Sequence, residues 1–297
     1  MGKQKLSYRL FRPDGNIKAA VFCVHGMQEH QKRYEALAKY LNQQHAYACV
    51  TFDLPGHGET AQNQNYGFFA ENKGAETLVD SAVEIVEITK QTFPNVPIIY
   101  FGHSMGTIIA RVFLQNHDAM IDGCVLSGIP AYNRLSGLGE FFAKCVISMK
   151  GKHNKSKFLE NLATGSFSKA IKNAETEADW LSYNKENVQA YLKDEMCGIP
   201  FTNQGYLDLF ALMTKMGNTS LYLCENPNLP MYIFAGEDDP CIGGKKGFQA
   251  SIHLLETVGY KNIQTKLFSH MRHETLHEDD AEMVMDCIVQ WLDENIR

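Results

Sequence analysis

The sequence lacks the features that mark membrane-spanning, secreted and nucleic-acid-binding proteins. No stretch reaches the roughly 18 consecutive apolar residues of a membrane span. The first fifteen residues alternate charged and apolar side chains, without the run of about 7–15 apolar residues that a signal peptide needs. The formal net charge is −6 and no long run of Lys or Arg occurs, which argues against nucleic acid as a partner. We therefore expect a soluble protein of the cytoplasm.

Cysteine and histidine are present, but without the spacings that bind metals. None of the eight cysteines lies in a C-x-x-C pair, so neither a zinc knuckle nor a redox motif is supported. Three of them, Cys23, Cys49 and Cys124, lie in apolar runs and are expected to be buried, reduced thiols. The eleven histidines form no H-E-x-x-H or comparable set. The sequence therefore predicts no metal site.

The composition is that of an ordinary globular protein, with 44% hydrophobic and 21% charged residues in a chain of 297. Short apolar runs alternate with segments of helical periodicity. Strands are expected at residues 5–11, 19–24, 47–52, 98–101, 123–126, 231–235 and 263–268, and helices at residues 31–44, 74–91, 105–115, 245–258 and 278–294. This alternation predicts an α/β fold with a mostly parallel, doubly wound sheet, whose ligands bind beyond the carboxyl ends of the strands.

One long interval, residues 127–229, breaks the alternation. Strands are usually connected by about 4–6 residues or by one helix. This interval instead contains several segments of helical pattern, among them FFAKCVISM and YLDLFALMTKM. We interpret residues 128–229 as a helical cap inserted over the strand ends, and expect residues 1–127 and 230–297 to form the core.

A G-x-S-x-G motif, Gly102-His103-Ser104-Met105-Gly106, stands between an expected strand and an expected helix. In this context the serine lies at the tip of a sharp, strained turn, and the two glycines let strand and helix approach closely. The turn directs the hydroxyl into the cleft, and the following helix presents the backbone N–H of Met105 there. Ser104 is therefore the predicted nucleophile.

A serine nucleophile needs a base and an acid that orients the base. In this type of fold the chain order is Ser, acid, His. Asp238 and Asp239 follow one expected strand, and because they are neighbours their side chains point apart, so only one can reach the base. His270, His273 and His277 follow the next strand, and a solvated or capping role suits His277 at the start of the last helix. The residues alone leave both choices open.

The turn after the first buried strand, His25-Gly26-Met27, is a second functional element. A tetrahedral intermediate needs two preorganised backbone donors. One comes from the residue after the nucleophile and the other from this early turn, so Met27 and Met105 form the predicted oxyanion hole. Gly26, His25 and His103 flank it and are expected to contact substrate.

Some histidines near these turns are interpreted as structural. His25 and His30 precede the acid in the chain, whereas the base must follow it, so packing or hydrogen bonding within the loop is expected of them. His57 lies in the turn Pro55-Gly56-His57-Gly58, whose chemistry is explained without a catalytic histidine.

Five segments carry a resemblance to a known family: VHGMQEHQKRYEALAKYL, FDLPGHGET, FGHSMGTIIAR, GEDDPCIGG and the RHE of MRHETLHE. The sequence resembles serine hydrolases of the α/β-hydrolase fold, and among them the monoacylglycerol lipase and lysophospholipase branch of serine aminopeptidase S33-like proteins. The resemblance implies that Ser104 is the nucleophile, Asp239 the acid, His273 the base and Met27 an oxyanion donor. The segment DWLSYNKENVQAYLKDEMCGIPFT is similar to the cap of lysophospholipase-like members. A small departure, Glu59-Thr60 where members commonly have Ser, does not touch the chemistry.

Ester hydrolysis through an acyl-enzyme, without a cofactor, is the activity that the resemblance implies. Lysophospholipids, monoacylglycerols or related single-chain esters are the expected substrates, with a transient contact between the cap and a membrane surface; no oligomeric state is predicted. Aromatic residues of the cap are expected to line an acyl tunnel, or alternatively to form the cap's own core: Phe141, Phe142, Phe158, Phe167 and Trp180.

Other activities are compatible with the same triad. An aminopeptidase needs carboxylates that hold the substrate ammonium, and the cap offers Glu160, Glu175, Glu177 and Asp179. A hydrolase of carbon–carbon bonds is a further alternative. A non-catalytic ligand-binding protein is disfavoured by the intact triad. A dehalogenase or an epoxide hydrolase is also disfavoured, because those enzymes have Asp at the position of Ser104.

Overall fold

The computed structural model describes residues 5–61, 65–132 and 136–296. Residues 1–4, 62–64, 133–135 and 297, which belong to the core and cap ranges expected above, lie outside this description. Within the described ranges, no helix is both long and apolar enough to cross a bilayer. Cys23, Cys49 and Cys124 are buried and unpaired, as expected.

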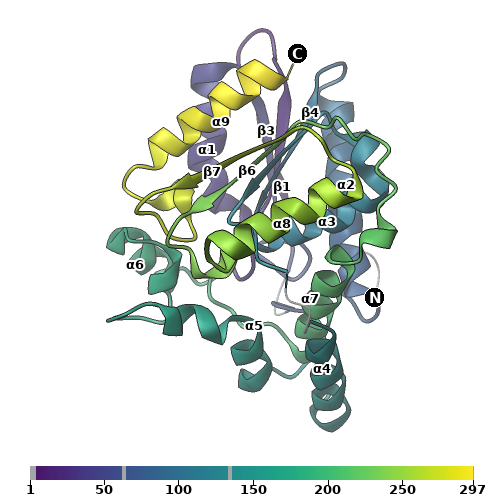
Figure 1. Ribbon diagram of the computed structural model, residues 1–297, viewed down its shortest axis with the longest axis vertical. Helices are drawn as coiled ribbons and strands as arrows, with labels where there is room; N and C mark the ends of the chain where they lie inside the picture. The colour runs from purple at the N-terminus through teal and green to yellow at the C-terminus, as the bar shows by residue number, and fades with distance from the viewer. Residues whose placement is uncertain (1–4, 62–64, 133–135, 297) are drawn as a thin grey trace.

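A twisted sheet forms the centre of the molecule (Figure 1). Its strands lie in the order β1 (Tyr8–Phe11), β3 (Ala48–Phe52), β2 (Ala20–Val24), β4 (Ile98–His103), β5 (Gly123–Ser127), β6 (Met231–Gly236) and β7 (Ile263–Phe268). β1 is antiparallel to β3, and all other neighbours are parallel. Every residue of β2 to β6 is buried, as continuous apolar runs predict for strands covered on both faces. The expected doubly wound sheet is thus confirmed.

Helices cover both faces of the sheet (Figure 1). One face packs against α1 (Glu35–His45) and α9 (Ala281–Asn295). The other packs against α2 (Gly74–Thr92), α3 (Met105–His117) and α8 (Gly244–Val258). The short 3₁₀ turns are η1 (Gln31–Tyr34), η2 (Asp118–Met120), η3 (Asp179–Leu181), η4 (Thr219–Leu221), η5 (Pro240–Ile242) and η6 (Thr275–His277). His277 therefore ends a 3₁₀ turn and does not begin the last helix, which starts at Ala281.

The long interval between β5 and β6 is helical, as expected. It contains α4 (Ser136–Lys150), α5 (Lys157–Ala170), α6 (Lys185–Lys193) and α7 (Asn203–Met216), which gather at one end of the sheet (Figure 1). Because β5 ends at Ser127 and the parallel strands run alongside it, this is the carboxyl end of the sheet. We call residues 136–229 the inserted segment.

The inserted segment is not packed as a separate body. Leu209, Phe210 and Leu212 of α7 belong to the same hydrophobic cluster as the face of the sheet that α2 and α3 cover. A small cluster of its own contains only Ala178, Leu181 and Val188, with Trp180 and Tyr191 against it. One part of the segment thus completes the main core, and another part forms a thin layer over the strand ends.

Candidate active site

Ser104 lies in the sharp turn that the motif predicts. Its φ of 52° and ψ of −115° are strained for a residue with a side chain. A Cβ added to Gly102 would lie 2.8 Å from the carbonyl oxygen of Gly106, and one added to Gly106 would lie 2.1 Å from that of Val24. Glycine is therefore required at both positions, because β4, α3 and the end of β2 meet there without room for side chains.

Neighbouring strand ends hold this turn in place. The backbone N–H of Ser104 donates to the carbonyl of Ser127 at the end of β5 (3.0 Å). A Cβ on Gly26 would lie 3.1 Å from the Cβ of Ser104, so the turn after β2 passes directly beside the serine. Met27 and Met105 line the same pocket as Ser104, and their role as the two oxyanion donors stays a prediction.

Asp239 and His273 form a buried hydrogen-bonded pair beyond β6 and β7. His273 Nδ1 lies 2.8 Å from Asp239 Oδ2, and the two side chains are 2% and 0% exposed. Asp239 Oδ1 accepts the backbone N–H of Cys241 at 2.8 Å, as the cap of η5. Each carboxylate oxygen therefore has a fixed partner, and the imidazole is held in one orientation.

The structure separates the alternatives that the sequence left open. Asp238 is exposed, and its Oδ2 accepts the hydroxyl of Tyr183 at 3.0 Å. His270 is also exposed and stacks on Tyr183 at 4.4 Å between ring centroids. His277 Nε2 bonds the carbonyl of Arg33 at 3.0 Å. Of the five candidates only His273 lines the pocket of Ser104, and Asp239 is the carboxylate bonded to it.

Two aromatic rings enclose the imidazole of His273. The His103 ring lies 4.7 Å and the Trp180 ring 4.8 Å from it, centroid to centroid. Within the described residues His273 Nε2 is buried without a hydrogen-bond partner, so it is available to a reacting group. Burial lowers the pKa of His273, but the charge and hydrogen bond of Asp239 outweigh burial, and the pKa is raised overall.

A network of charged side chains borders the same site. The sequence patterns did not predict this network. Arg33 Nη2 donates to Glu274 Oε2 at 2.7 Å, and its Nε lies 3.8 Å from Glu29 Oε2. Glu29 Oε1 accepts the backbone N–H of Gly26 at 2.5 Å and the Tyr34 hydroxyl at 2.7 Å. Their positions beside the two motifs, Glu29 after H-G-M-Q and Glu274 after His273, are the signal that could have found the two carboxylates.

The two carboxylates of this network titrate in opposite directions. Burial raises the pKa of Glu29. Burial also acts to raise the pKa of Glu274, but the charge of Arg33 outweighs it and lowers that pKa to about 2. Glu274 and Arg33 are thus a charged pair.

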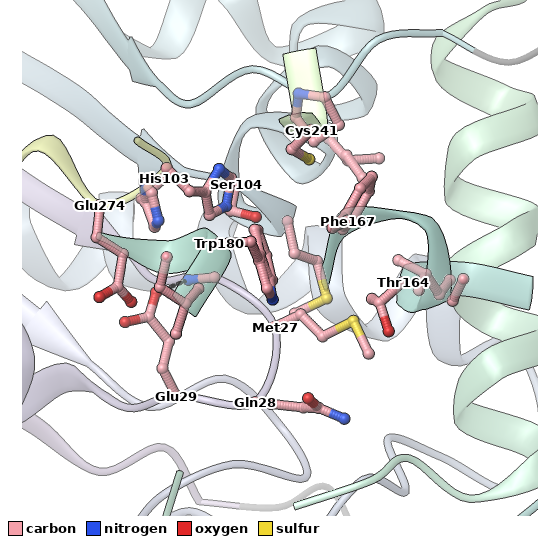
Figure 2. Close-up of a pocket in the computed structure, with 18 of the residues that line it drawn as sticks. Met27, Gln28, Glu29, His103, Ser104, Thr164, Phe167, Trp180, Cys241 and Glu274 are labelled. Carbon is pink, nitrogen blue, oxygen red and sulfur yellow. Dashed lines mark hydrogen bonds between the residues drawn. The ribbon is translucent and has the colours of Figure 1, made fainter. Parts of the chain in front are cut away.

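The space between the residues that line the pocket amounts to about 680 Å³ when its open mouth is included. Its ends differ in chemistry. Glu29 and Glu274 lie at one side of Ser104 and Trp180, and Phe167 and Thr164 lie at the other (Figure 2). The apolar wall consists mainly of side chains from α3, α5 and α7: Ile108, Ala163, Phe167, Leu209 and Met213.

Several residues expected to contact substrate lie elsewhere. Phe141 and Phe142 on α4 are 59% and 40% exposed, and neither they nor Phe158 line the pocket. The prediction that these phenylalanines line the site is wrong. Apolar periodicity identifies the apolar face of a helix, but it does not show which part of the chain packs against that face. Gly26, His103, Phe167 and Trp180 do line the pocket.

His25 is likewise outside the pocket and fully buried. Its Nδ1 lies 2.8 Å from the Gly26 carbonyl, and its Nε2 accepts the Leu54 N–H at 3.0 Å, so both ring nitrogens hold loops together. None of the carboxylates expected to hold an ammonium group lines the pocket: Glu160, Glu175, Glu177 and Asp179.

Two groups in the described chain combine His, Asp and Cys closely enough to suggest a metal. One is Asp239, Cys241 and His273, which belongs to the site above. In the other, His30 Nε2 lies 2.8 Å from Asp194 Oδ2. His30 Nδ1 accepts the Lys32 N–H, so Nε2 carries the proton and donates it to Asp194. This group is satisfied as a hydrogen-bonded pair, and the absence of a metal stays a prediction.

Solved structures share this fold. A thermostable carboxyl esterase from Bacillus coagulans superimposes with a TM-score of 0.92 over 100% of this chain and 96% of its own, at 23% identity. A monoacylglycerol lipase from Paleococcus ferrophilus has a TM-score of 0.73 over 98% and 99%, at 20% identity. The molecule therefore has the α/β-hydrolase fold.

Sequence comparison defines the family more closely. The signature of the family described as serine aminopeptidase, S33, matches residues 15–280, so the chain belongs to that family. A monoacylglycerol lipase of Mycolicibacterium smegmatis is 24% identical over 98% of this chain and 94% of its own. The human monoglyceride lipase is 31% identical over 41% of this chain, a stretch that spans 39% of the human protein.

Proposed function

We propose that this protein is a serine carboxylic ester hydrolase that acts through an acyl-enzyme on single-chain esters. The observation that carries the proposal is Ser104 on a strained turn, in a pocket with a mainly apolar wall that His273 also lines, with the buried Asp239 bonded to that histidine. The relatives named monoacylglycerol lipase and carboxyl esterase support the same reaction class.

The geometry suggests the following steps. His273 Nε2 takes the proton of the Ser104 hydroxyl as its oxygen attacks the ester carbonyl, and Asp239 stabilises the imidazolium that forms. The backbone N–H groups of Met27 and Met105 donate to the oxyanion. His273 then gives its proton to the departing alcohol. A water molecule, activated by the same imidazole, attacks the acyl-enzyme and releases the carboxylic acid. These reaction steps require neither a metal nor a cofactor.

The two ends of the pocket favour a particular orientation of substrate. The apolar wall of α5 and α7 suits an acyl chain, because each buried methylene contributes about 0.8 kcal/mol. The end near Glu29 and Glu274 suits the alcohol portion. Arg33 offsets the charge of Glu274, and burial favours the neutral form of Glu29. Hydroxyl groups, as in glycerol, fit this end better than the ammonium group of a peptide.

A surface of the inserted segment suits contact with an anionic lipid surface. Large apolar side chains are exposed on α4 and α5: Leu138, Phe141, Phe142, Met149, Phe158 and Leu162. Between residues 144 and 172 there are seven lysines and one acidic residue, although the whole chain carries −6. Exposed apolar side chains next to lysines are typical of interfacial helices. We call this exposed apolar set and its lysines the α4–α5 surface. The cytoplasmic location stays a prediction.

A chain-length series tests the proposal. We expect kcat/KM for p-nitrophenyl esters, measured below their aggregation concentrations, to rise from acetate to at least medium-chain acids. Monoacylglycerols or lysophospholipids should be hydrolysed, and triacylglycerols poorly, since a site covered by the inserted segment leaves little room for three chains. Aminoacyl anilides should be poor substrates. If the kcat/KM of an aminoacyl anilide exceeds that of every ester, the protein is an aminopeptidase with the same triad. If neither esters nor anilides are hydrolysed, it is a binding protein.

A further inference from the structure

The loop that carries His273 is tied to the inserted segment by one buried carboxylate. Glu278 lies just before α9 and is 6% exposed. Its Oε1 accepts the backbone N–H of Arg272, the residue before His273, at 2.7 Å. Its Oε2 accepts three donors from the inserted segment: the Ser182 hydroxyl at 2.6 Å, the Tyr183 N–H at 2.9 Å and the Asn184 N–H at 3.2 Å.

The residues on either side of His273 bond the same stretch of the inserted segment. Arg272 Nη1 donates to the carbonyl of Asp179 at 2.6 Å, and its guanidinium lies 3.9 Å from the centre of the Tyr183 ring. The backbone N–H of Glu274 donates to the carbonyl of Leu181 at 2.7 Å. The stretch from residue 179 to 184 is therefore fixed to the loop of the base at several points, and Glu278 accepts three bonds from that stretch and one from the loop.

Trp180 is the side chain that this arrangement places on the site. It lies in η3, between Asp179 and Leu181, whose carbonyls accept the bonds just described. Its ring packs against the imidazole of His273, as the ring of His103 also does. Because Asp239 fixes only Nδ1, these rings limit tilting of the imidazole about that hydrogen bond.

We infer that Glu278 is a positioning residue for the reaction: it holds the Trp180 turn against His273 and so keeps Nε2 directed at Ser104. The inference rests on the proposed function. An ionised carboxylate is required, because it offers only acceptors to the four converging donors. A glutamine of the same shape turns an NH₂ group toward at least one N–H or O–H donor, which breaks the connection without removing volume.

The test compares Glu278→Gln with Asp279→Asn, a neutralised carboxylate that neighbours it on the chain and is exposed. With p-nitrophenyl butyrate, Glu278→Gln should lower kcat about 10- to 100-fold with KM changed less than about threefold, since a small misplacement of a reacting group costs this much. Asp279→Asn should stay within about twofold of the wild type. The rate of Ser104 labelling by a fluorophosphonate should fall in parallel with kcat.

A double-mutant cycle separates positioning from stability. If Glu278 acts through Trp180, then Glu278→Gln should cost less than about twofold in the Trp180→Ala background. Full additivity, or a folded Glu278→Gln enzyme with the wild-type kcat, would overturn the inference. Should Glu278→Gln not fold, Ser182→Ala removes one of the four bonds and should lower kcat about threefold, whereas unchanged kcat overturns the idea. A Ser104→Ala variant that still hydrolyses esters would instead remove the proposed function.

Discussion

The inserted segment has two parts that meet the rest of the molecule in different ways. The stretch from residue 179 to 187 is bonded to the loop of His273, and Trp180 and Tyr191 turn toward the pocket. On the α4–α5 surface, Phe141, Phe142 and Met149 are 59%, 40% and 73% exposed instead. Both parts carry aromatic residues, and what distinguishes them is whether the rest of the molecule covers those side chains. The bonded part shapes the site, and the exposed part is free for an external surface.

The largest expected effect comes from a residue that belongs to neither part. If the reacting groups all lie on the sheet, Ser104→Ala should lower kcat for ester hydrolysis about 10⁶-fold while the thermal unfolding curve stays close to that of the wild type. The measurement is turnover of p-nitrophenyl butyrate by purified enzyme. Residual activity above about 1% would place a reacting group elsewhere, and the inserted segment would be the first place to look.

The turn after β6 offers a sharper contrast between two neighbouring carboxylates. Asp239→Asn should lower kcat about 10⁴-fold, because an amide favours the wrong tautomer of His273. Asp238→Asn removes only the exposed contact with Tyr183 and should cost less than about threefold. Steady-state kinetics of the two variants decide the assignment. A larger loss in Asp238→Asn would assign the acid of the triad to Asp238 instead.

The α4–α5 surface can be tested without touching the site. The double variant Phe141→Ser, Phe142→Ser should weaken binding to vesicles that contain anionic lipid about 100-fold, because burying each Phe side chain contributes at least about 1.5 kcal/mol. Its kcat/KM for p-nitrophenyl butyrate in solution should stay within about twofold. Leu223→Ser, at an apolar residue 63% exposed outside this surface, is the matched control. Equal vesicle binding by all three proteins would remove the proposed membrane contact.

The smallest effect concerns stability in acid and contrasts the core with the exposed surface. Burial lowers the pKa of His57 to about 3, whereas the unfolded chain takes up a proton near 6.5. The unfolded state therefore binds more protons below that pH, and His57 makes the fold less stable as pH falls. Between pH 7 and pH 5 the loss is about 2 kcal/mol. Urea unfolding should show that His57→Gln loses less stability over this interval, by about that amount.

His153, 59% exposed at its side chain, provides the control for that experiment. His153→Gln should keep the wild-type difference in unfolding free energy between pH 7 and pH 5. A His57→Gln variant with an unchanged difference would show that His57 is protonated in the folded state.

How much the sequence reveals depends on the range of the interactions involved. The buried strands and the turn at Ser104 are predictable, because apolar runs and glycine spacing are local signals that any parallel sheet must obey. The choice of Asp239 over Asp238 rested on a family pattern, since neighbouring carboxylates differ only in direction. The role of Glu278 is not predictable, because its donors at residues 182–184 come close only after folding. The exposure of Phe141 is likewise not predictable, because it depends on whether another part of the folded chain packs against α4 at that point.

The central claim is that Ser104 forms the acyl-enzyme. The direct test is to mix the protein with p-nitrophenyl decanoate, quench in acid within a turnover, digest, and locate the decanoyl group by peptide mass spectrometry. The account predicts one decanoylated peptide, modified at Ser104, that is absent from Ser104→Ala and persists longer in His273→Ala when acylation is forced at high ester concentration. A decanoyl group on another residue of the wild type, with Ser104 unmodified at every quench time, would contradict it.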